Sequence, residues 1–488
     1  MTQPGVEDVD VVVIGGGPAG SSLAAFVAMR GHRVLLLEKE RFPRYQIGES
    51  LLPATVRGTC QLLGVADDLR DAGFIVKRGG YFRWGSAPEP WVLDFKDVPG
   101  LGEGIPSYQV ERMTFDHILL RNARRTGADV REECAVTGVV HGDERVEGVR
   151  YVDRSGRERL ARARFVVDAS GNTGQTFRAV TGNRIYSDFF RNIALFGYFE
   201  GGRRLPEPYS GNVLTAAFTS GWFWYIPLRP NLTSVGAVVS REMADKVRGD
   251  RERALYALIE ECPMVRDLLA PARRVTDGVY GRIRTRKDYS YSADRFWRPG
   301  MVLIGDAACF VDPVLSSGVH LATYSALLAA RSINSTLAGD LAEDVAFDEF
   351  ESRYRREYAH FYEFLVSFYD RHVDERSYFW TAKKLINYPA SELEAFTSLV
   401  SGLGSGEGAL LGSDRPIWHP PEIEEGTPAG RFPDWDTDRH IRFDARHPLF
   451  EAKEWVPGGV PNQGPRPGGL IPSEDGLRWT VPEPAPVA

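Results

Sequence analysis

A glycine-rich turn between a short apolar strand and a helix constrains the fold more than any other feature of the sequence. The turn reads GGGPAG and matches the pattern GxGxxG, in which each fixed glycine has a mechanical task. Gly15 permits a tight turn, Gly17 lets the backbone approach a pyrophosphate, and Gly20 lets the helix pack closely on the strand. Pro18 and Ala19 begin the helix, whose unpaired N–H groups attract phosphate. The turn therefore predicts a βαβ unit that binds a dinucleotide.

The residues around the turn support this interpretation. β-branched runs flank an alanine-rich stretch that ends at Gly31, which is the pattern of a strand, a helix and a second strand. Glu38 closes the second strand about 20 residues after the turn, where a carboxylate accepts hydrogen bonds from ribose hydroxyls and disfavours a 2′-phosphate. A glycine-rich turn that binds no ligand is the alternative.

Two further apolar runs, ARFVVDASG and PGMVLIGDAA, have the continuous character of parallel strands buried on both faces. Between them, residues 192–238 alternate aromatic and small residues, which predicts antiparallel strands of a second layer. We therefore expect an α/β, Rossmann-like three-layer fold with an inserted antiparallel substrate sheet. The nucleotide-binding module is expected over residues 1–340, with the substrate sheet formed by about 76–108 and 180–285. A helical and irregular region follows over residues 341–488.

Two helices are expected after the last parallel strand. The first is rich in Ala and Leu and runs from Ser317 to about Ala338. The second carries an aromatic stripe, which predicts core packing; its members are Phe347, Phe350, Tyr354, Tyr358, Phe361 and Phe368. After Gly402 the chain turns to Gly, Pro and acidic residues, as in PNQGPRPGG, and we expect an extended arm over the body without a motif of its own.

The composition excludes several classes of protein. No apolar run reaches the roughly 18 residues that cross a bilayer, and the N-terminus lacks the pattern of a secretory signal, so we expect a soluble, cytoplasmic protein without a membrane partner. The four cysteines are scattered, which argues against a metal site or disulfides. A net charge of −7 provides no positive electrostatic potential to attract the phosphate backbone of nucleic acid, so nucleic acid is not an expected partner.

Three separated segments resemble FAD enzymes of the aromatic-hydroxylase type. They are GDAA after the strand MVLI, DASG at Asp168–Gly171, and Arg112 in QVERMTFDHILL. The resemblance implies that Asp306 holds the ribityl chain of FAD. For Arg112 a surface salt bridge is the alternative. The cofactor residues implied by the resemblance and the turn are Gly15, Gly17, Pro18, Ala19, Gly20, Glu38, Lys39, Arg44, Ser50, Arg112, Asp168, Gly171, Asp306, Pro313 and Gly318.

The segment GWFWYIPL resembles the WxWxIP signature of the flavin-dependent halogenases. Its fixed positions are Trp222, Trp224, Ile226 and Pro227. Alternation along a strand points Trp222 and Trp224 to one face, where bulky indoles can separate a flavin from a substrate. A well-packed aromatic strand without a chemical task is compatible with the same pattern.

Lys77, in FIVKRGGYFRWG, matches the position of the catalytic lysine in related halogenases. In that family, reduced FAD and O2 form a hydroperoxide, and chloride attacks it to give hypochlorous acid. A buried amine can hold this acid by a hydrogen bond, or form a chloramine, and direct it to one ring carbon. Burial lowers the pKa of a lysine and makes either role accessible near neutral pH. The alternative is a solvated lysine at a strand edge.

The segment PVLSSG before the first long helix resembles the chloride site of the family. The N–H groups of Ser317 and Gly318 are unpaired at a helix start, where the dipole favours a small anion. Ser317 as a plain N-cap is the alternative.

The resemblance extends from about residue 8 to about residue 384. It is greatest to halogenases that chlorinate phenols in the biosynthesis of antibiotics and other natural products, including the tyrosine halogenases of glycopeptide biosynthesis. Tryptophan halogenases place a catalytic glutamate where this chain has Leu315, which puts an indole substrate in doubt. The resemblance implies a phenolic ring on a carrier protein, with FADH2 from a separate flavin reductase because no second glycine-rich nucleotide turn exists. An FAD-dependent hydroxylase and a flavin-binding protein without turnover are the alternatives.

Overall fold

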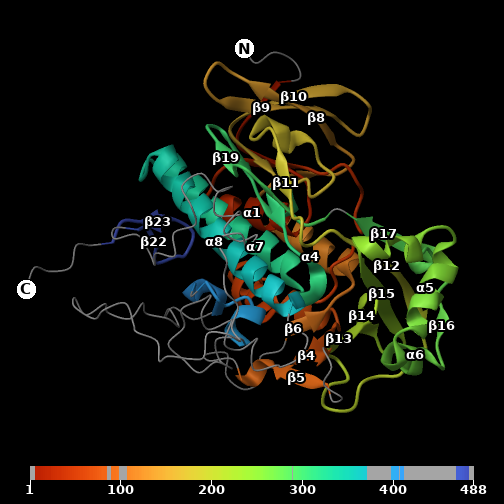
Figure 1. Ribbon diagram of the computed structural model, residues 1–488. Coiled ribbons are helices and arrows are strands. Elements are labelled where there is room, and N and C mark those ends of the chain that lie inside the picture. Colours follow the sequence, from red (N-terminus) through yellow and green to blue (C-terminus); the bar gives the residue numbers. More distant parts are fainter. Residues whose placement is uncertain are drawn as a thin grey trace, which may run out of the picture.

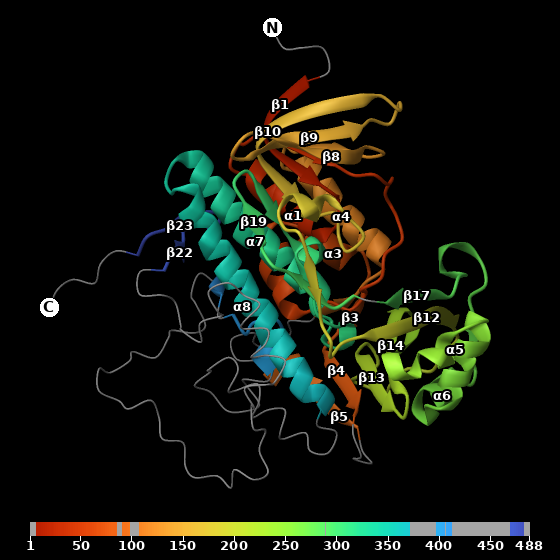
Figure 2. The same ribbon diagram turned by 45° about the horizontal axis from the view of Figure 1, so that its top comes forward.

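The computed structural model describes residues 6–84, 90–97, 107–287, 289–370, 397–405, 407–411 and 469–482. Two large sheets dominate these residues, and long helices lie beside the first of them (Figure 1). Most of the second sheet, which is antiparallel apart from one parallel pair of strands, lies on the side of the molecule away from helix α8 in both views (Figure 2). The space between the sheets is where the site is built.

The first sheet contains the βαβ unit predicted from the glycine turn. Strands β20, β10, β1, β2 and β7 run parallel in this order, β19 adds an antiparallel edge, and β9 and β8 extend from β10. Their bounds are β1 Val6–Ile14, β2 Val34–Leu37, β7 Asp129–Arg131, β8 Ala135–His141, β9 Val146–Val152, β10 Glu158–Asp168, β19 Trp297–Arg298 and β20 Met301–Leu303. The central strands are buried on both faces, as their continuous apolar sequences require. The predicted α/β fold class is confirmed.

Helices cover this sheet and pack on one another. Helix α1 is buried along its whole length because it contacts both α4 and α7, and α8 lies along α7. The bounds are α1 Pro18–Ala28, α2 Cys60–Leu62, α3 Ala66–Asp71, α4 Arg112–Arg125, α5 Arg251–Glu260, α6 Pro263–Leu269, α7 Ser317–Ala338 and α8 Glu343–Asp370. The aromatic stripe of α8 packs into the core, as predicted. The division expected at residue 340 falls between α7 and α8 and stays a prediction.

The second sheet has the order β16-β12-β15-β14-β13-β4-β5, with β17 also paired to β12. Its bounds are β4 Gly79–Arg83, β5 Trp91–Asp94, β12 Asn192–Glu200, β13 Val213–Phe218, β14 Gly221–Arg229, β15 Leu232–Ser240, β16 Arg273–Arg274 and β17 Arg284–Lys287. One face packs under α5 and α6 in a core of its own, and the other faces the first sheet. Alternation along each strand divides its side chains between these two environments.

Several short pairs complete the fold. They are β3 Ile75–Lys77 with β6 Ser107–Gln109, β11 Arg184–Tyr186 with β18 Tyr291–Ala293, β18 with β21 Cys309–Phe310, and β22 Ile471–Pro472 with β23 Trp479–Thr480. The expected arm after Gly402, including PNQGPRPGG, lies mostly outside the described residues. Of its later part, residues 469–482 dock on α7 and α8, and Trp479 is buried there. None of the helices described is both long and apolar enough to span a bilayer.

Candidate functional site

A cavity of about 520 Å³ lies between the two sheets, at the carboxyl ends of the parallel strands. Ile14, Leu37 and Ile304 mark these strand ends in its wall. Most of the predicted cofactor residues line it, namely Gly15, Gly17, Pro18, Ala19, Glu38, Lys39, Arg44, Ser50, Arg112, Gly171, Asp306, Pro313 and Gly318. The structure thus brings residues from five distant segments to one cavity. Gly20, Asp168, Ser317, Pro227 and Lys77 do not line it.

The glycine turn shapes one end of the cavity. Gly15 has a φ of +101°, a conformation that residues with a Cβ rarely adopt. A Cβ on Gly20 would lie 1.9 Å from the carbonyl oxygen of Gly15, so Gly20 acts through close packing and not through contact with the cavity. A Cβ on Gly17 would meet only Arg44 Nη2, at 3.5 Å. The space beside Gly17 is therefore open to a group that binds the N-terminus of α1.

Glu38 stands at the end of β2 and is 5% exposed. Its Oε2 accepts a hydrogen bond from the Gly16 N–H at 2.6 Å, and its Oε1 accepts one from the Glu40 N–H at 2.8 Å. The two bonds fix the carboxylate beside the turn. Each oxygen keeps a lone pair for a hydroxyl donor, which is the arrangement that a ribose requires.

Two arginines share one buried carboxylate at the cavity wall. Arg112 binds Asp116 through two N–H groups, at 2.7 and 3.0 Å, and Arg44 Nη1 binds the same carboxylate at 2.9 Å. Arg112 also donates to the carbonyl oxygen of Ile47 at 2.6 Å. The surface salt bridge considered for Arg112 is wrong, because the side chain is buried. Arg44 Nε also lies 3.6 Å from Glu40 Oε2, so two carboxylates balance the two arginines, whose N–H groups at the cavity wall can still bind a pyrophosphate.

Asp306 and Asp168, both predicted from their motifs, have different surroundings. Asp306 lines the cavity, and burial raises its pKa to about 6 against the effect of Arg112. Asp168 is buried behind the wall, and its carboxylate accepts hydrogen bonds from Ser170 Oγ and Thr176 Oγ1 at 2.5 and 2.6 Å. Because these bonds use both oxygens, Asp168 orders the loop that lines the cavity and has no direct contact with it.

The strand β14 forms an aromatic wall. Trp222, Trp224 and Ile226 face the cavity, whereas Phe223 and Tyr225 point into the core under α5 and α6. By alternation, Pro227 lies on the same face of the strand as Phe223 and Tyr225, and it does not line the cavity. Both indoles are held by hydrogen bonds. Trp222 Nε1 donates to the Tyr369 hydroxyl at 2.6 Å, and Trp224 Nε1 donates to Ser234 Oγ at 3.1 Å.

The segment Pro313–Gly318, the halide turn below, joins β21 to α7 at the cavity wall. Ser316 adopts a φ of +60° and occupies the N-cap, so the alternative that Ser317 is the cap residue is wrong. Ser317 is buried, its Oγ has no hydrogen-bond partner within the described residues, and its side chain does not line the cavity. Gly318 does line it, and the first N–H groups of α7 are unpaired there, as at any helix start.

Lys77 is 2% exposed, so the solvated lysine considered from the sequence is wrong. Its Nζ donates to the Leu51 carbonyl oxygen at 2.8 Å, and burial lowers its pKa to about 7. In the antiparallel pairing, Lys77 lies opposite Ser107, and Gln109 lies opposite Ser50. Paired residues and residues two apart share a face, so the four side chains form one polar row.

The polar row of Lys77, Ser107, Gln109 and Ser50 begins at the cavity, which Ser50 lines, and ends at the lysine. All four side chains are at most 5% exposed. Ser50 Oγ, Ser107 Oγ and Gln109 Oε1 have no hydrogen-bond partner within the described residues. Buried polar atoms are rarely left unpaired in proteins, so this row offers free hydrogen-bonding groups to a small polar molecule.

Sequence reasoning missed several residues of the wall. Glu49 lines the cavity, accepts a hydrogen bond from the Tyr198 hydroxyl at 2.8 Å, and has a pKa that burial raises to about 7. Tyr198 in turn contacts Tyr45 through their hydroxyls at 2.7 Å. Arg286 and Tyr289 also line the cavity. No sequence motif marked Glu49, Arg286 or Tyr289 individually.

The residues present fit an FAD molecule. The open space beside Gly17, the fixed Glu38 carboxylate and the guanidinium groups of Arg44 and Arg112 at the wall match a pyrophosphate and a ribose at the start of α1. Three or more potential metal ligands do not come together anywhere in the described part of the chain.

The chain is similar in sequence and structure to several known proteins. A family model described as tryptophan halogenase matches residues 10–106 and 96–424. The tryptophan 2-halogenase of Chondromyces crocatus is 33% identical over 404 residues, which are 80% of this chain and 75% of that protein. The structure of the myxobacterial chondrochloren halogenase CndH is 52% identical with a TM-score of 0.77, over 97% of this chain and 100% of that one. The flavin-dependent brominase Bmp2 is 28% identical with a TM-score of 0.70, over 81% of this chain and 94% of that one.

Proposed function

The chain belongs to the tryptophan halogenase family of flavin-dependent enzymes, and from this premise we propose that it chlorinates a phenolic ring in natural-product biosynthesis. The observation that carries the proposal is the placement of Lys77. The lysine is buried at one end of the polar row, and Ser50 at the other end lines the cavity. A reactive species made in the cavity can thus reach the lysine without crossing solvent.

The cavity would hold FAD along the first sheet. Gly15, Gly17 and the start of α1 would bind the pyrophosphate with Arg44, and Glu38 would bind the ribose. Reduced FAD bound there supplies, with O2 and chloride, the oxidant hypochlorous acid. The halide turn would hold chloride through the N–H groups of Ser317 and Gly318. We propose that a separate flavin reductase provides FADH2, because the sequence has no second glycine-rich nucleotide turn.

The aromatic wall would close the cavity, and Lys77 would hold the electrophile. The buried indoles of Trp222 and Trp224 close the cavity on the side of the second sheet. With a pKa of about 7, the Lys77 side chain is present as both amine and ammonium near neutral pH. The ammonium can donate a hydrogen bond to the oxygen of hypochlorous acid, and the amine can form an N–Cl bond while the O–Cl bond breaks and the hydroxyl group leaves as water with one amine proton. In both cases the electrophile is held at a fixed nitrogen and does not diffuse.

A phenol suits this site better than an indole does. Leu315 replaces the glutamate that tryptophan halogenases place before the chloride motif, and it is packed in the core. Among the described residues, no carboxylate forms an ion pair with Lys77. A phenol is activated by its own oxygen and needs no carboxylate to stabilise the cationic intermediate. Indole is the second candidate, because the relative from Chondromyces crocatus is named a tryptophan 2-halogenase.

We also propose that the ring is a tyrosyl or polyketide-derived unit attached to a carrier protein. The resemblance of the motif segments to carrier-dependent halogenases supports this proposal. Bromide is a further possible halide, because a site of backbone N–H groups selects weakly by ion size and Bmp2 is named a brominase.

The test is a product analysis by mass spectrometry. The protein is supplied with flavin reductase, FAD, NADH, O2 and chloride, and with free phenols, carrier-bound aryl units and tryptophan in parallel. The proposal expects a phenolic product heavier by one chlorine, with its isotope pattern. Chlorinated tryptophan alone would favour the second candidate. A product that contains only added oxygen would instead identify a hydroxylase.

A further inference from the structure

The buried carboxyl of Asp312 lies directly before the halide turn, and the proposed function gives it no role. Asp312 is 0% exposed and does not line the cavity. Its Oδ1 accepts a hydrogen bond from the Val314 N–H at 3.1 Å, which closes the first bend of the turn. Its Oδ2 accepts one from Asn192 Nδ2 at 3.3 Å. Within the described residues, no Lys, Arg or His lies within ion-pair distance of Asp312.

A chain of hydrogen bonds connects Asp312 to the aromatic wall. Trp222 Nε1 donates to the Tyr369 hydroxyl at 2.6 Å, and that hydroxyl donates to Asp312 Oδ1 at 3.0 Å. The directions follow from the groups themselves. An indole N–H can only donate, so the single proton of the Tyr369 hydroxyl goes to the carboxyl. Tyr369 comes from the last turn of α8, so three distant elements meet at this carboxyl.

An anion in the halide turn is opposed by a charged carboxylate that has no cation beside it. The neutral acid form of Asp312 does not oppose it. We propose that Asp312, held in place by Tyr369, couples halide binding at the turn to the uptake of one proton by its carboxyl. The proton comes from solvent and forms an O–H bond on the carboxyl group. Asp312 is therefore a positioning residue that acts on the halide through charge and through the shape of the turn.

The surroundings of Asp312 are consistent with this role. Burial raises the pKa of Asp312 to about 6, and the Val314 N–H, Tyr369 and Asn192 lower it. The titratable groups that face Asp312 are Tyr369 and Tyr289, both tyrosines whose pKa burial raises well above the ordinary value. Neither changes charge between pH 5 and 8.

Two carboxyls of the cavity wall whose pKa burial raises, Glu49 and Asp306, contribute to the pH dependence of the site. Burial raises the pKa of Glu49 to about 7 and that of Asp306 to about 6. A pH profile of the unaltered protein alone does not separate the effects of these carboxyls from the effect of Asp312. A comparison of the pH profiles of Asp312 variants with that of the unaltered protein separates them.

The inference rests on the proposed halide site and is tested by binding, not by turnover. Sodium bromide is titrated into the FAD-loaded, oxidised full chain from pH 5 to 8, and the dissociation constant is read from the flavin absorption spectrum. One linked proton raises the dissociation constant by up to about tenfold per pH unit above the pKa of Asp312. Asp312→Asn keeps the shape and the acceptor for the Val314 N–H but carries no charge. The expected result is bromide binding equal to that of the unaltered protein at pH 5 and up to about a hundredfold tighter at pH 8.

Tyr369→Phe provides a second, independent variant in case Asp312→Asn does not fold. It removes the donor that stabilises the carboxylate, so the bend in the bromide profile should move to higher pH. Tyr362→Phe is the matched control. Tyr362 lies two turns earlier on α8, and its hydroxyl contacts Ser187 Oγ at 2.9 Å. Its ring packs on Phe190, as that of Tyr369 does. The control should leave the profile unchanged.

The outcomes separate this inference from the proposed function. Weaker bromide binding in Asp312→Asn at every pH would show a purely structural residue and overturn the coupling. An unchanged pH profile in both Asp312→Asn and Tyr369→Phe would overturn it as well. If the unaltered protein binds FAD but no bromide at any pH, the halide turn itself is wrong, and the proposed function loses its chloride site.

Discussion

Lys77 Nζ donates a hydrogen bond to the carbonyl oxygen of Leu51 at 2.8 Å, one residue beyond the Ser50 side chain that lines the cavity. The lysine is thus tied to the segment that forms the cavity wall, although it lies outside the cavity. The Phe95 ring lies 5.4 Å from the same nitrogen. A side chain anchored in this way can receive an oxidant from the polar row without contact with FAD.

Removal of the Lys77 amine should therefore abolish chlorination and leave FAD binding intact. Lys77→Met keeps most of the buried chain, so the fold and the cavity are expected to persist. Chlorinated product is measured by mass spectrometry, and the FAD dissociation constant by fluorescence. Lys246→Met, which alters an exposed lysine paired with Glu261 at 2.6 Å, is the control and should change neither quantity. Retained chlorination in Lys77→Met would remove the lysine from the mechanism.

The same variant should change the pH dependence of stability. Burial lowers the pKa of Lys77 from 10.5 to about 7, so the folded state disfavours the ammonium. The folded state is thus penalised below pH 7, and the penalty disappears as pH rises from 7 to 10.5. One pKa unit corresponds to about 1.4 kcal/mol, so the advantage of Lys77→Met should be a few kcal/mol larger at pH 6 than at pH 10. Urea unfolding of FAD-free protein measures it, and a constant difference would contradict the buried ammonium.

The polar row should control how much oxidant reaches the lysine. Ser107→Ala removes an oxygen that has no partner within the described residues, so it should alter the free energy of unfolding by less than about 1 kcal/mol. It should lower the chlorinated product formed per FADH2 and raise the hydrogen peroxide or free hypochlorous acid released. Thr336→Val is the control, because Thr336 Oγ1 is also unpartnered but lies at the far end of α7. Equal yields in both variants would exclude a path along the row.

The sequence predicted the parts of this molecule whose geometry is local. The turn at Gly15, the buried parallel strands and the alternation of Trp222 and Trp224 all depend on neighbouring residues. The position of Lys77 outside the cavity depends on the pairing of β3 with β6 and on the bridge between Ser50 and Gln109, which no local pattern encodes. Tertiary packing also determines which motif residues lie behind the cavity wall and not in it.

Asp168 and Glu49 show in two ways that a sequence motif does not determine whether a side chain lines the cavity. Asp168 stands in a recognisable motif, yet the hydroxyls of Ser170 and Thr176 bind its carboxylate behind the wall. Glu49 stands in an ordinary loop, yet the approach of Tyr198 from β12 makes it a buried acid of the cavity. Motif residues are therefore predictable as a group, whereas the orientation of each side chain follows from contacts made far along the chain.

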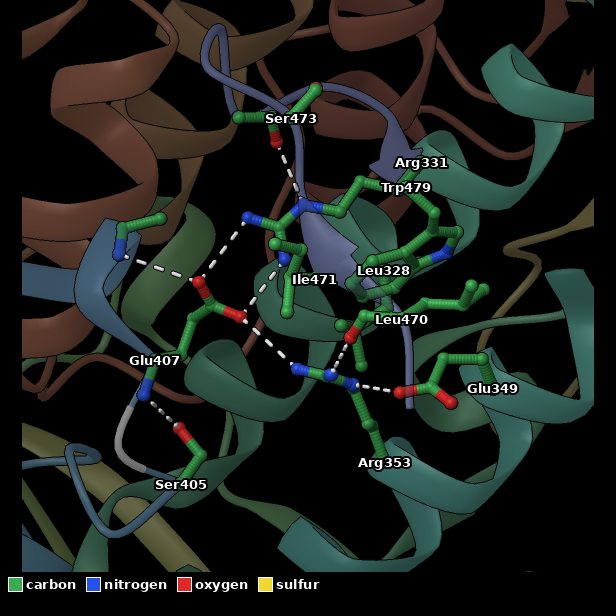
Figure 3. Close-up of polar contacts among 12 residues, drawn as sticks. Leu328, Arg331, Glu349, Arg353, Ser405, Glu407, Leu470, Ile471, Ser473 and Trp479 are labelled. Carbon is green, nitrogen blue, oxygen red and sulfur yellow. Dashed lines mark hydrogen bonds and ion pairs between the residues drawn. The ribbon is translucent and has the colours of Figure 1, made fainter. Parts of the chain in front are cut away.

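The buried ion cluster of Arg331, Arg353 and Glu407, which lies beside Trp479 of the docked residues 469–482, should contribute strongly to stability. Figure 3 shows Glu407 between Arg331 of α7 and Arg353 of α8, beside Trp479. Arg331 binds the two Glu407 oxygens at 2.9 and 3.3 Å. Its guanidinium group lies 4.9 Å from the Trp479 ring. Glu407→Gln leaves the fully buried Arg331 without its anion, whereas Arg353 keeps its ion pair with Glu349 at 2.6 Å, and the loss at Arg331 should lower the free energy of unfolding by about 3–5 kcal/mol.

Thermal and urea unfolding measure the effect of Glu407→Gln. The control is Arg30→Ala, which removes the partly exposed ion pair of Arg30 with Asp475 in the docked residues 469–482. Both partners are about one third exposed there, so the loss should stay below about 1 kcal/mol. An equal loss of unfolding free energy in the two variants would show that the buried ion cluster stabilises the protein no more than the exposed ion pair does.

The two glycines of the nucleotide turn should respond differently to alanine. A Cβ on Gly20 would lie 1.9 Å from the backbone oxygen of Gly15, so Gly20→Ala must move backbone and should lower stability by several kcal/mol. Gly17 has a φ of −67°, and its Cβ would lie 3.5 Å from Arg44 Nη2, so Gly17→Ala should fold normally. Its methyl group nevertheless fills the space for the pyrophosphate and should weaken FAD binding by about tenfold or more. Unfolding of FAD-free protein and fluorescence titration with FAD separate the two effects, and unchanged FAD binding in Gly17→Ala would place the pyrophosphate elsewhere in the cavity.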